Sequence, residues 1–520
     1  MIKYLCTVLL IVLSFTTKVY ANPLVHTSLG DIQGVVENGV EVFKGIPYAK
    51  NPEGDLRFAP PQKAEAFKST FKADKFCKIV PQYSFLTNFE QETGSFDNNY
   101  LCLNIYRKSN IAKNEKLPVY VWIYGGAFVS GDSSLPIYHG KSFAKNGVIL
   151  VTLNYRLHAL GFYSSKATLK EYKTTGNWGL LDQISALEWV HDHIREFGGD
   201  PNKVTIGGES AGAYSVSALL LSPKARGLFK RAIMQSGTIL NYPFSSFTAK
   251  ENQYTTYKNS FNVAKTFGAD DSETGLNLLR QLDPMLLATQ ASFDYDFIKG
   301  KTYNYLKPNF DGVVLPRDPY KALASHKFPK VDVLIGYNTH EGVNFVQDGI
   351  KEQDFIKALN NHFGQDKGQL LKELYPIDKE HDVLTCQVEF LGDIMFNLGT
   401  KIFLDKLSEK NKVYAYHFDF STRNGVVPHI SELPYTFNTL NEKSSDLQKD
   451  VADIVHKRFV NFIKTGDPNT DGKQKTLLRW PKYESKHKYV FKFDTFSTVE
   501  SYQLYDRLDK LEQIIYKGQF

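Results

Sequence analysis

One serine lies where the chain changes from a strand pattern to a helix pattern. Ser210 stands in Gly208-Glu209-Ser210-Ala211-Gly212, after residues 203–207 and before the apolar run 213–221. Small residues on both sides permit the sharp, strained turn that lifts a serine hydroxyl above a sheet. The helix N-terminus that follows favours negative charge, and the backbone N–H of Ala211 is available to an oxyanion. The pattern indicates a serine nucleophile for acyl transfer, with an ordinary small-residue turn as the alternative.

A glycine-rich strand end supplies further candidate donors to an oxyanion. Residues 117–124 form a continuous apolar run that predicts a buried strand, and the run ends in Gly125-Gly126-Ala127-Phe128. Small residues there let the backbone approach a substrate carbonyl. We therefore predict an oxyanion hole made of the N–H groups of Gly126, Ala127 and Ala211, in which one donor is typically worth ~2.7 to 4 kcal/mol. A simple strand-end turn is the alternative.

Two further strand ends supply the acid and the base that a weak nucleophile such as serine requires. The apolar run 331–338 predicts a strand, and Glu341 follows at the carboxyl end, where open parallel sheets carry their chemistry. Another strand is predicted over 413–420, and His429 lies in the loop 425–435 that follows it. We predict Glu341 as the orienting carboxylate and His429 as the general base.

The order of the three residues along the chain narrows the class of enzyme. Ser210, Glu341 and His429 follow the nucleophile, acid, base order of α/β-hydrolases and neither of the other two common serine-hydrolase orders. The neighbouring His340 is interpreted as a residue that tunes or lines the pocket. An unperturbed histidine pKa of ~6.5 predicts activity that rises with pH through one group. This chemistry needs no metal and no cofactor, and none is predicted.

The N-terminus has the pattern of a signal peptide over residues 1–21. Lys3 precedes an apolar stretch over 5–15, and Val19-Tyr20-Ala21 is a suitable cleavage site. The apolar stretch is too short to span a membrane, and no second run of roughly 20 apolar residues occurs. The sequence therefore predicts a secreted, extracellular protein without a membrane span.

Length and composition favour one large domain over residues 22–520. The 520 residues contain no Pro-, Gly- or Ser-rich linker and no internal repeat, and a hydrophobic content of 42% is ample for a large core. The net charge of +6 is small for this length and well mixed, which argues against a nucleic-acid partner. The predicted partner is a small-molecule ester, bound by a monomer or a weak homodimer.

Several further sequence blocks accompany the serine turn. They are Phe43-Lys44-Gly45-Ile46-Pro47-Tyr48-Ala49, Arg57-Phe58-Ala59-Pro60-Pro61, Asn154-Tyr155-Arg156, Gly176-Asn177-Trp178-Gly179, Phe197-Gly198-Gly199-Asp200-Pro201, Gln235-Ser236-Gly237 and Thr465-Gly466-Asp467-Pro468-Asn469. Together these blocks resemble the type B carboxylesterases, the cholinesterase-like branch of the α/β-hydrolases, and the secreted insect-type esterases among them. The resemblance implies an α/β-hydrolase fold, in which a central, mostly parallel twisted sheet is flanked by helices. It also implies hydrolysis of carboxylic esters through an acyl-enzyme at the bottom of a gorge.

The resemblance also implies a disulfide. Of the 4 cysteines, Cys6 falls in the predicted signal peptide, so three remain. The family's first disulfide favours a Cys77–Cys102 pair, although Cys102 stands two residues later than the family's cysteine, on the same face if the segment is a strand. Cys386 is then expected to be free and buried.

The substrate pocket is predicted from the same resemblance. Residues 78–100 contain no tryptophan, which disfavours choline esters because these bind on an aromatic platform. Phe244 and Phe297 resemble positions that line the acyl pocket, and Tyr124 replaces the family's usual histidine before the glycine pair. Glu209 is expected near the pocket, where its charge disfavours anionic substrates. We predict neutral, apolar esters, whether short acyl esters, xenobiotics or a lipophilic signal.

Alternatives of other classes remain open at this stage. A slow-turnover relative of the same fold sequesters esters stoichiometrically and also needs an active serine. An adhesion-type ectodomain of this fold typically lacks the serine or the histidine, whereas Ser210 and His429 are both present. A lipase of the same fold would need a lid and an exposed apolar face.

Overall fold

The computed structural model describes most of the chain after the predicted signal peptide. Phe244 and the signal-peptide segment lie outside the described residues, so these two predictions are not addressed by the structure. The described ranges are residues 22–82, 99–112, 114–174, 176–241, 249–290, 295–302, 304–422, 424–469 and 478–516.

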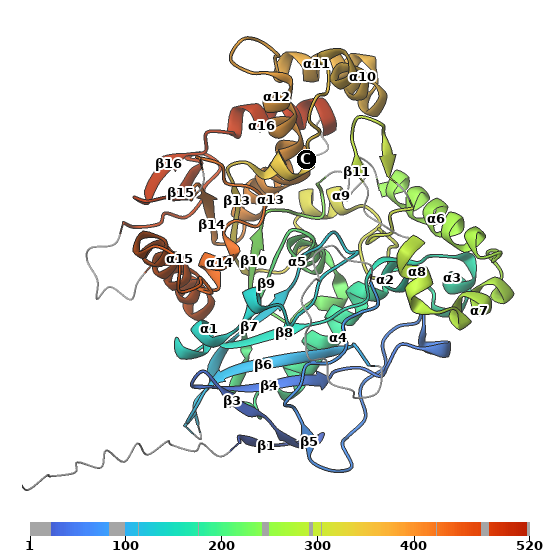
Figure 1. The fold of residues 1–520 in the computed structure, drawn as a ribbon, viewed down its shortest axis with the longest axis vertical. Helices are drawn as coiled ribbons and strands as arrows, with labels where there is room; N and C mark the ends of the chain where they lie inside the picture. The colour runs from blue at the N-terminus through green and yellow to red at the C-terminus, as the bar shows by residue number, and fades with distance from the viewer. Residues whose placement is uncertain are drawn as a thin grey trace, which may run out of the picture.

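An eleven-stranded sheet runs through the molecule (Figure 1) in the order β16-β15-β14-β13-β10-β9-β7-β8-β6-β4-β3. The seven strands from β15 to β8 pair in parallel, and antiparallel strands complete both edges. The strands of this eleven-stranded sheet are β3 (Val35–Glu37), β4 (Val40–Pro47), β6 (Cys102–Lys108), β7 (Leu117–Ile123), β8 (Ile149–Leu153), β9 (Gly199–Glu209), β10 (Arg231–Gln235), β13 (Asp332–Asn338), β14 (Val413–Phe418), β15 (Tyr489–Phe493) and β16 (Thr498–Ser501). The predicted mostly parallel α/β sheet is confirmed.

Small sheets and helices surround the large sheet. The small sheets are formed by β1 (Leu24–Thr27), β2 (Gly30–Gln33) and β5 (Phe71–Lys72), and by β11 (Tyr295–Asp296) and β12 (Lys301–Thr302). The α-helices are α1 (Lys141–Lys145), α2 (His158–Phe162), α3 (Lys166–Tyr172), α4 (Trp178–His193), α5 (Ala211–Leu221), α6 (Ala249–Thr266), α7 (Glu273–Gln281), α8 (Pro284–Gln290), α9 (Pro319–Ala324), α10 (Glu352–Phe363), α11 (Gln365–Leu374), α12 (Val383–Gly392), α13 (Leu398–Ser408), α14 (Leu433–Thr436), α15 (Asp446–Thr465) and α16 (Tyr505–Tyr516). Short 3-10 helices include η2 (Pro136–Tyr138) and η4 (Glu341–Phe345), and η5 (Asp393–Asn397) is a π-helix.

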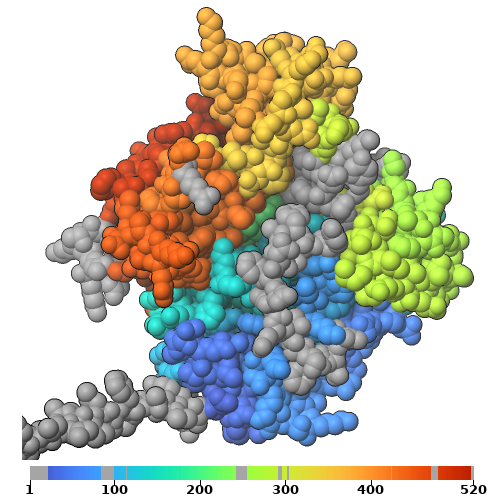
Figure 2. Space-filling view, in the orientation of Figure 1, coloured from blue at the N-terminus to red at the C-terminus, as the bar shows by residue number. Residues whose placement is uncertain are grey.

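Helices cover the sheet because its central strands are apolar on both faces. Every residue of β8 and of β14 is buried, as expected for parallel strands packed on both sides. Helix α5 packs against β7, β9 and β10, whereas α15 packs against β7 and β9. In Figure 1, α1 and α15 lie on one side of the strands, and α4 and α5 lie on the other. Figure 2 shows α6 to α8 and α10 to α12 as two projecting lobes beside this body.

The strands predicted to carry the chemistry agree closely with the observed ones. The predicted strands 117–124, 331–338 and 413–420 correspond to β7, β13 and β14, and the serine turn lies between β9 and α5. Since β7, β9, β10, β13 and β14 are parallel, their carboxyl ends lie at one edge of the sheet. That edge therefore gathers the candidate residues from distant parts of the sequence.

Cys77 and Cys102 form a disulfide, the pair that the family resemblance implied, and their Cα atoms are 6.6 Å apart. Cys386 has a free, buried thiol. Burial raises the pKa of this thiol to about 11. In the described part of the chain, no helix combines the length and the hydrophobicity needed to cross a bilayer.

The disulfide should stabilise the fold by restricting the unfolded chain. It closes a loop between cysteines 25 residues apart, for which the chain-entropy estimate is about 3 kcal/mol. We expect Cys77→Ser/Cys102→Ser to lower the free energy of unfolding in urea by about this amount. A reductant should destabilise the wild-type protein to the same degree and leave the double variant unchanged. Equal unfolding midpoints for the two proteins would contradict the assignment of a stabilising role.

Candidate active site

The serine turn has a strained backbone that only small neighbours permit. Ser210 lies directly between β9 and α5 with φ 53° and ψ −126°, outside the regions that L-residues ordinarily occupy. A Cβ at Gly208 would collide with the backbone of Gly212, and a Cβ at Gly212 would collide with the carbonyl oxygen of Ile123. The two glycines that flank the serine are therefore required by close packing of the turn against the end of β7.

The glycine-rich segment after β7 lies against this turn. A Cβ on Gly125 would be 2.6 Å from the carbonyl oxygen of Glu209 and 3.0 Å from the Cβ of Ser210. The next residues have positive φ angles, 106° at Gly126 and 54° at Ala127. Tyr305 Oη donates a hydrogen bond of 2.8 Å to the carbonyl oxygen of Ala127. The backbone predicted to form the oxyanion hole thus borders Ser210, next to the N-terminus of α5 where Ala211 begins the helix.

Glu341 and His429 form a short buried hydrogen bond. His429 Nδ1 lies 2.6 Å from Glu341 Oε2, and the two side chains are almost inaccessible to solvent. The backbone N–H of Asn338 donates to Glu341 Oε1 at 2.7 Å, which fixes the carboxylate at the end of β13. In the neutral imidazole, a proton on Nδ1 that is directed at Glu341 leaves Nε2 as an acceptor. The structure brings the predicted acid and base together in the geometry that general-base chemistry requires.

The accepting nitrogen of His429 faces the serine turn. His429 Nε2 lies 3.1 Å from Oε1 of Glu209, the residue before Ser210. The pair lacks the geometry of a hydrogen bond, and both atoms are buried without a hydrogen-bond partner in the described structure. A general base needs a nitrogen that is free to accept a proton. His429 Nε2, buried without a hydrogen-bond partner beside a strained serine, meets this requirement.

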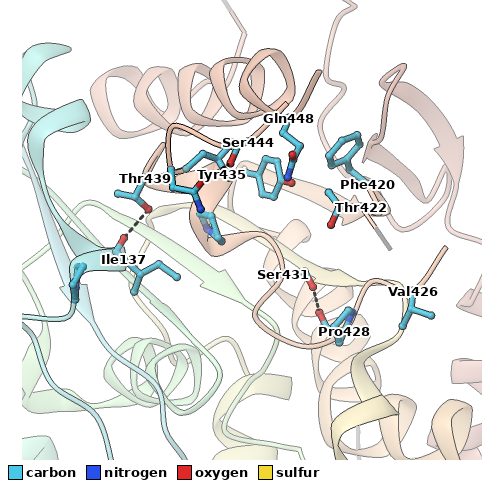
Figure 3. Close-up of a pocket in the computed structure, with 14 residues that line it drawn as sticks. Ile137, Phe420, Thr422, Val426, Pro428, Ser431, Tyr435, Thr439, Ser444 and Gln448 are labelled. Atoms are coloured by element: carbon cyan, nitrogen blue, oxygen red, sulfur yellow. Dashed lines mark hydrogen bonds between the residues drawn. The ribbon is translucent and has the colours of Figure 1, made fainter. Parts of the chain in front are cut away.

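A tight turn holds His429 in place. Ser431 Oγ donates a hydrogen bond of 2.6 Å to the carbonyl oxygen of Pro428, as Figure 3 shows. Ile430, between them, has a φ of 70°, which is rare for a β-branched residue. A cavity of about 620 Å³ lies against this turn and is lined by Pro428 and Ser431, together with neutral residues of α14 and its neighbours.

Three buried carboxylates surround the single imidazole. Glu432, which the sequence analysis missed, is fully buried and accepts hydrogen bonds from Asn338 Nδ2 at 2.6 Å and from Gln235 Nε2 at 3.1 Å. Burial raises the pKa of Glu209 to about 8 although nearby His429 opposes the rise, and the charges of Glu432 and Glu341 add to it. The sequence signal for Glu432 is that it is the one charged residue in the segment 430–435.

These carboxylates change the expected acid–base behaviour of the histidine. Burial opposes the charged imidazolium, but Glu209 and Glu341 outweigh burial and raise the pKa of His429 above the ordinary value of 6.5. A general base acts in its neutral form, so a raised pKa shifts the rise of activity toward higher pH. The midpoint of ~6.5 expected from the sequence is therefore corrected upward.

Two phenylalanines that sequence reasoning missed pack on the histidine. The ring centre of Phe396 is 4.3 Å from that of His429, and the ring centre of Phe345 is 5.9 Å from it. Phe396 belongs to the π-helix η5, an irregularity that is common at functional sites. The base therefore has an apolar wall built from η4 and η5.

The other predicted pocket residues have different surroundings. Tyr124 is fully buried, and its ring stacks on Tyr155 with 4.6 Å between centres. Phe297 is also buried, stacks on His362 at 4.5 Å and lies 5.3 Å from Phe390, so it packs against α10 and α12. Of the predicted pocket residues, Glu209 contacts a candidate catalytic side chain, because its Oε1 lies 3.1 Å from His429 Nε2.

A mostly parallel sheet with a strand–serine–helix turn, and with an acid and a histidine after two later strands, defines an α/β-hydrolase. The Carboxylesterase family model matches residues 21–509, so the chain belongs to that family and is a carboxylic ester hydrolase. The para-nitrobenzyl esterase of Bacillus subtilis (strain 168) is 32% identical over 500 residues, which cover 92% of this chain and 96% of that protein. Liver carboxylesterase 1F of Rattus norvegicus is 30% identical and covers 94% of each chain. The solved structure of a thermophilic PNB esterase has a TM-score of 0.81 and 29% identity and covers 94% of this chain and 100% of its own.

Removal of one carboxylate should lower the pKa of the histidine. We expect Glu209→Gln to shift the acid limb of kcat/KM for p-nitrophenyl acetate to lower pH by about one unit, because a neighbouring negative charge that stabilises the imidazolium is lost. Glu188→Gln, an exposed position on α4, removes the same charge as a control and should leave the midpoint unchanged. An unaltered midpoint in Glu209→Gln would show that this carboxylate does not control the base.

Proposed function

We propose that the protein is a secreted serine carboxylesterase that hydrolyses neutral, apolar carboxylic esters through an acyl-enzyme. The observation that carries the proposal is the hydrogen bond of 2.6 Å between His429 and Glu341, beside a serine held at φ 53°. Ser210 is the nucleophile, His429 the general base and Glu341 the residue that orients it. These three roles are assigned from chemistry and geometry together.

Acylation begins when His429 Nε2 accepts the proton of Ser210 Oγ as this oxygen attacks the ester carbonyl. The N–H groups of Gly126, Ala127 and Ala211 donate to the oxyanion of the tetrahedral intermediate. His429 then gives its proton to the leaving alkoxide, which departs as an alcohol. Glu341 stabilises the imidazolium during this step without taking the proton.

Deacylation repeats the same proton transfers with water as the nucleophile. His429 removes a proton from water, hydroxide attacks the acyl-enzyme carbonyl, and Ser210 Oγ leaves with the proton from the imidazolium. The buried carboxylates Glu209 and Glu432 lie close enough to raise the pKa of His429. They stabilise the positive charge that the base gains in both halves of the reaction.

The substrate class follows from the surroundings of the base. Phe345 and Phe396 give it an apolar wall, and Glu209 beside it repels anionic groups whenever it is ionised. Together with the predicted contributions of Tyr124 and Phe297, these residues favour neutral, apolar esters. The names of the relatives, which include a para-nitrobenzyl esterase and liver carboxylesterases, are consistent with such substrates.

We further propose that residues 1–21 direct secretion and that residues 22–520 form one catalytic domain. The Cys77–Cys102 disulfide supports an oxidising compartment, because disulfides persist mainly in secreted and lumenal proteins. A monomer or weak homodimer and an insect-type origin remain predictions from the sequence.

The decisive experiment is stopped-flow hydrolysis of p-nitrophenyl acetate and butyrate by the purified protein, before and after treatment with an organophosphate. We expect a burst followed by rapid turnover that the organophosphate abolishes, and we expect Ser210→Ala to lose both the burst and the turnover while remaining folded. A stoichiometric burst with negligible turnover would instead identify the slow, sequestering type of esterase. Full activity of Ser210→Ala would mean that the nucleophile is another residue.

A further inference from the structure

His340 bonds directly to the segment that carries the candidate base. The backbone N–H of His340 donates to the carbonyl oxygen of Val427 at 2.9 Å. In return, the backbone N–H of Val427 donates to His340 Nδ1 at 3.1 Å. At the same place, His340 and Pro428 form an isolated parallel β-bridge. One residue thus uses both its backbone and its imidazole to hold the chain two residues before His429.

The bridge between His340 and residues 427–428 lies beside the hydrogen bond between Glu341 and His429. His340 immediately precedes Glu341, so the bridge and the Glu341–His429 hydrogen bond join the same two segments side by side. In the loop between β14 and the bridge, the described residues 422 and 424–426 are exposed to solvent. The next residue, Val427, is buried. The imidazole of His340 therefore holds the exposed loop at the point where it re-enters the protein, just before the base.

We propose that His340 is a positioning residue, whose neutral imidazole fixes Val427 and thereby sets His429 in register with Glu341. The proposal rests on the catalytic roles proposed above. Nδ1 can accept the Val427 N–H only while it carries no proton, so the imidazole must be neutral with its proton on Nε2. Protonation of Nδ1 would set two N–H groups against each other and open the bridge.

Burial and the charged groups around His340 determine the pH at which its imidazole becomes protonated. Burial lowers its pKa from the ordinary 6.5, although Asp419 opposes the shift and His417 adds to it. Asp419 pairs with Lys492 Nζ at 2.5 Å, and His417 Nδ1 lies 3.1 Å from Glu500 Oε1, so these groups also face the site from β15 and β16. The imidazole is therefore neutral at neutral pH, and the bridge opens only in acid.

The test compares two substitutions that differ in one hydrogen-bond acceptor. His340→Asn retains an acceptor, Oδ1, near the place of Nδ1, whereas His340→Leu has none. We expect His340→Leu to lower kcat for p-nitrophenyl butyrate about tenfold with little change in KM, and to slow phosphorylation of Ser210 by paraoxon to a similar extent. His340→Asn should restore most of both rates. Asn424→Gly, on the exposed part of the same loop at a φ of 51° that glycine tolerates, should behave as the wild-type protein.

Two readouts separate positioning from a general loss of structure. In His340→Leu, the strongly downfield proton resonance of the His429–Glu341 hydrogen bond should broaden or disappear, whereas His340→Asn should retain it. Below pH ~6.5, where His340 also becomes protonated, kcat should fall more steeply with falling pH in the wild-type protein than in His340→Asn. Wild-type kcat in His340→Leu, or equal impairment of the two variants, would overturn the proposal. Residual turnover in Ser210→Ala would instead refute the catalytic assignment on which it rests.

Discussion

The close approach of α5 to the end of β7 determines the geometry of the whole site. Gly212 lies so near the carbonyl oxygen of Ile123 that no side chain fits between them, and Gly125 approaches Glu209 and Ser210 in the same manner. This packing forces the serine into a strained turn and brings the glycine-rich segment beside it. The parallel register of β9, β10, β13 and β14 then carries the acid and the histidine to the same edge of the sheet.

A cluster of buried charge is the second determinant of the site. Glu209, Glu341 and Glu432 are all buried within reach of one imidazole. Carboxylates in such surroundings are costly to ionise unless they are hydrogen-bonded or paired. Glu341 and Glu432 are hydrogen-bonded by the backbone of Asn338 and by the side chains of Asn338 and Gln235. The cost is offset when the imidazole becomes charged, so this environment stabilises the protonated histidine that forms when Ser210 gives up its proton.

The sequence contained enough information to predict the sheet and to bring Ser210, Glu341 and His429 forward as candidates, because each follows a strand whose apolar pattern is local. The disulfide pair required the family resemblance, since spacing alone does not specify which cysteines meet. Glu432, Phe345 and Phe396 were missed because their importance depends on contacts between segments far apart in the chain. The hydrogen bond between His340 and Val427 could not be predicted for the same reason. From the sequence, His340 was predicted only to tune or line the pocket.

The left-handed backbone of Ile430 has a consequence for the evolution and engineering of the molecule. A β-branched residue at φ 70° costs of the order of 1–3 kcal/mol, and the residue is 45% exposed, so it recovers little of this cost through burial. The turn that holds His429 therefore lowers the stability of the folded protein. Asparagine or glycine, which tolerate this conformation, would relieve the strain without altering a catalytic atom. The turn is therefore a place where thermal tolerance can be gained separately from catalytic power, a separation that active sites seldom allow.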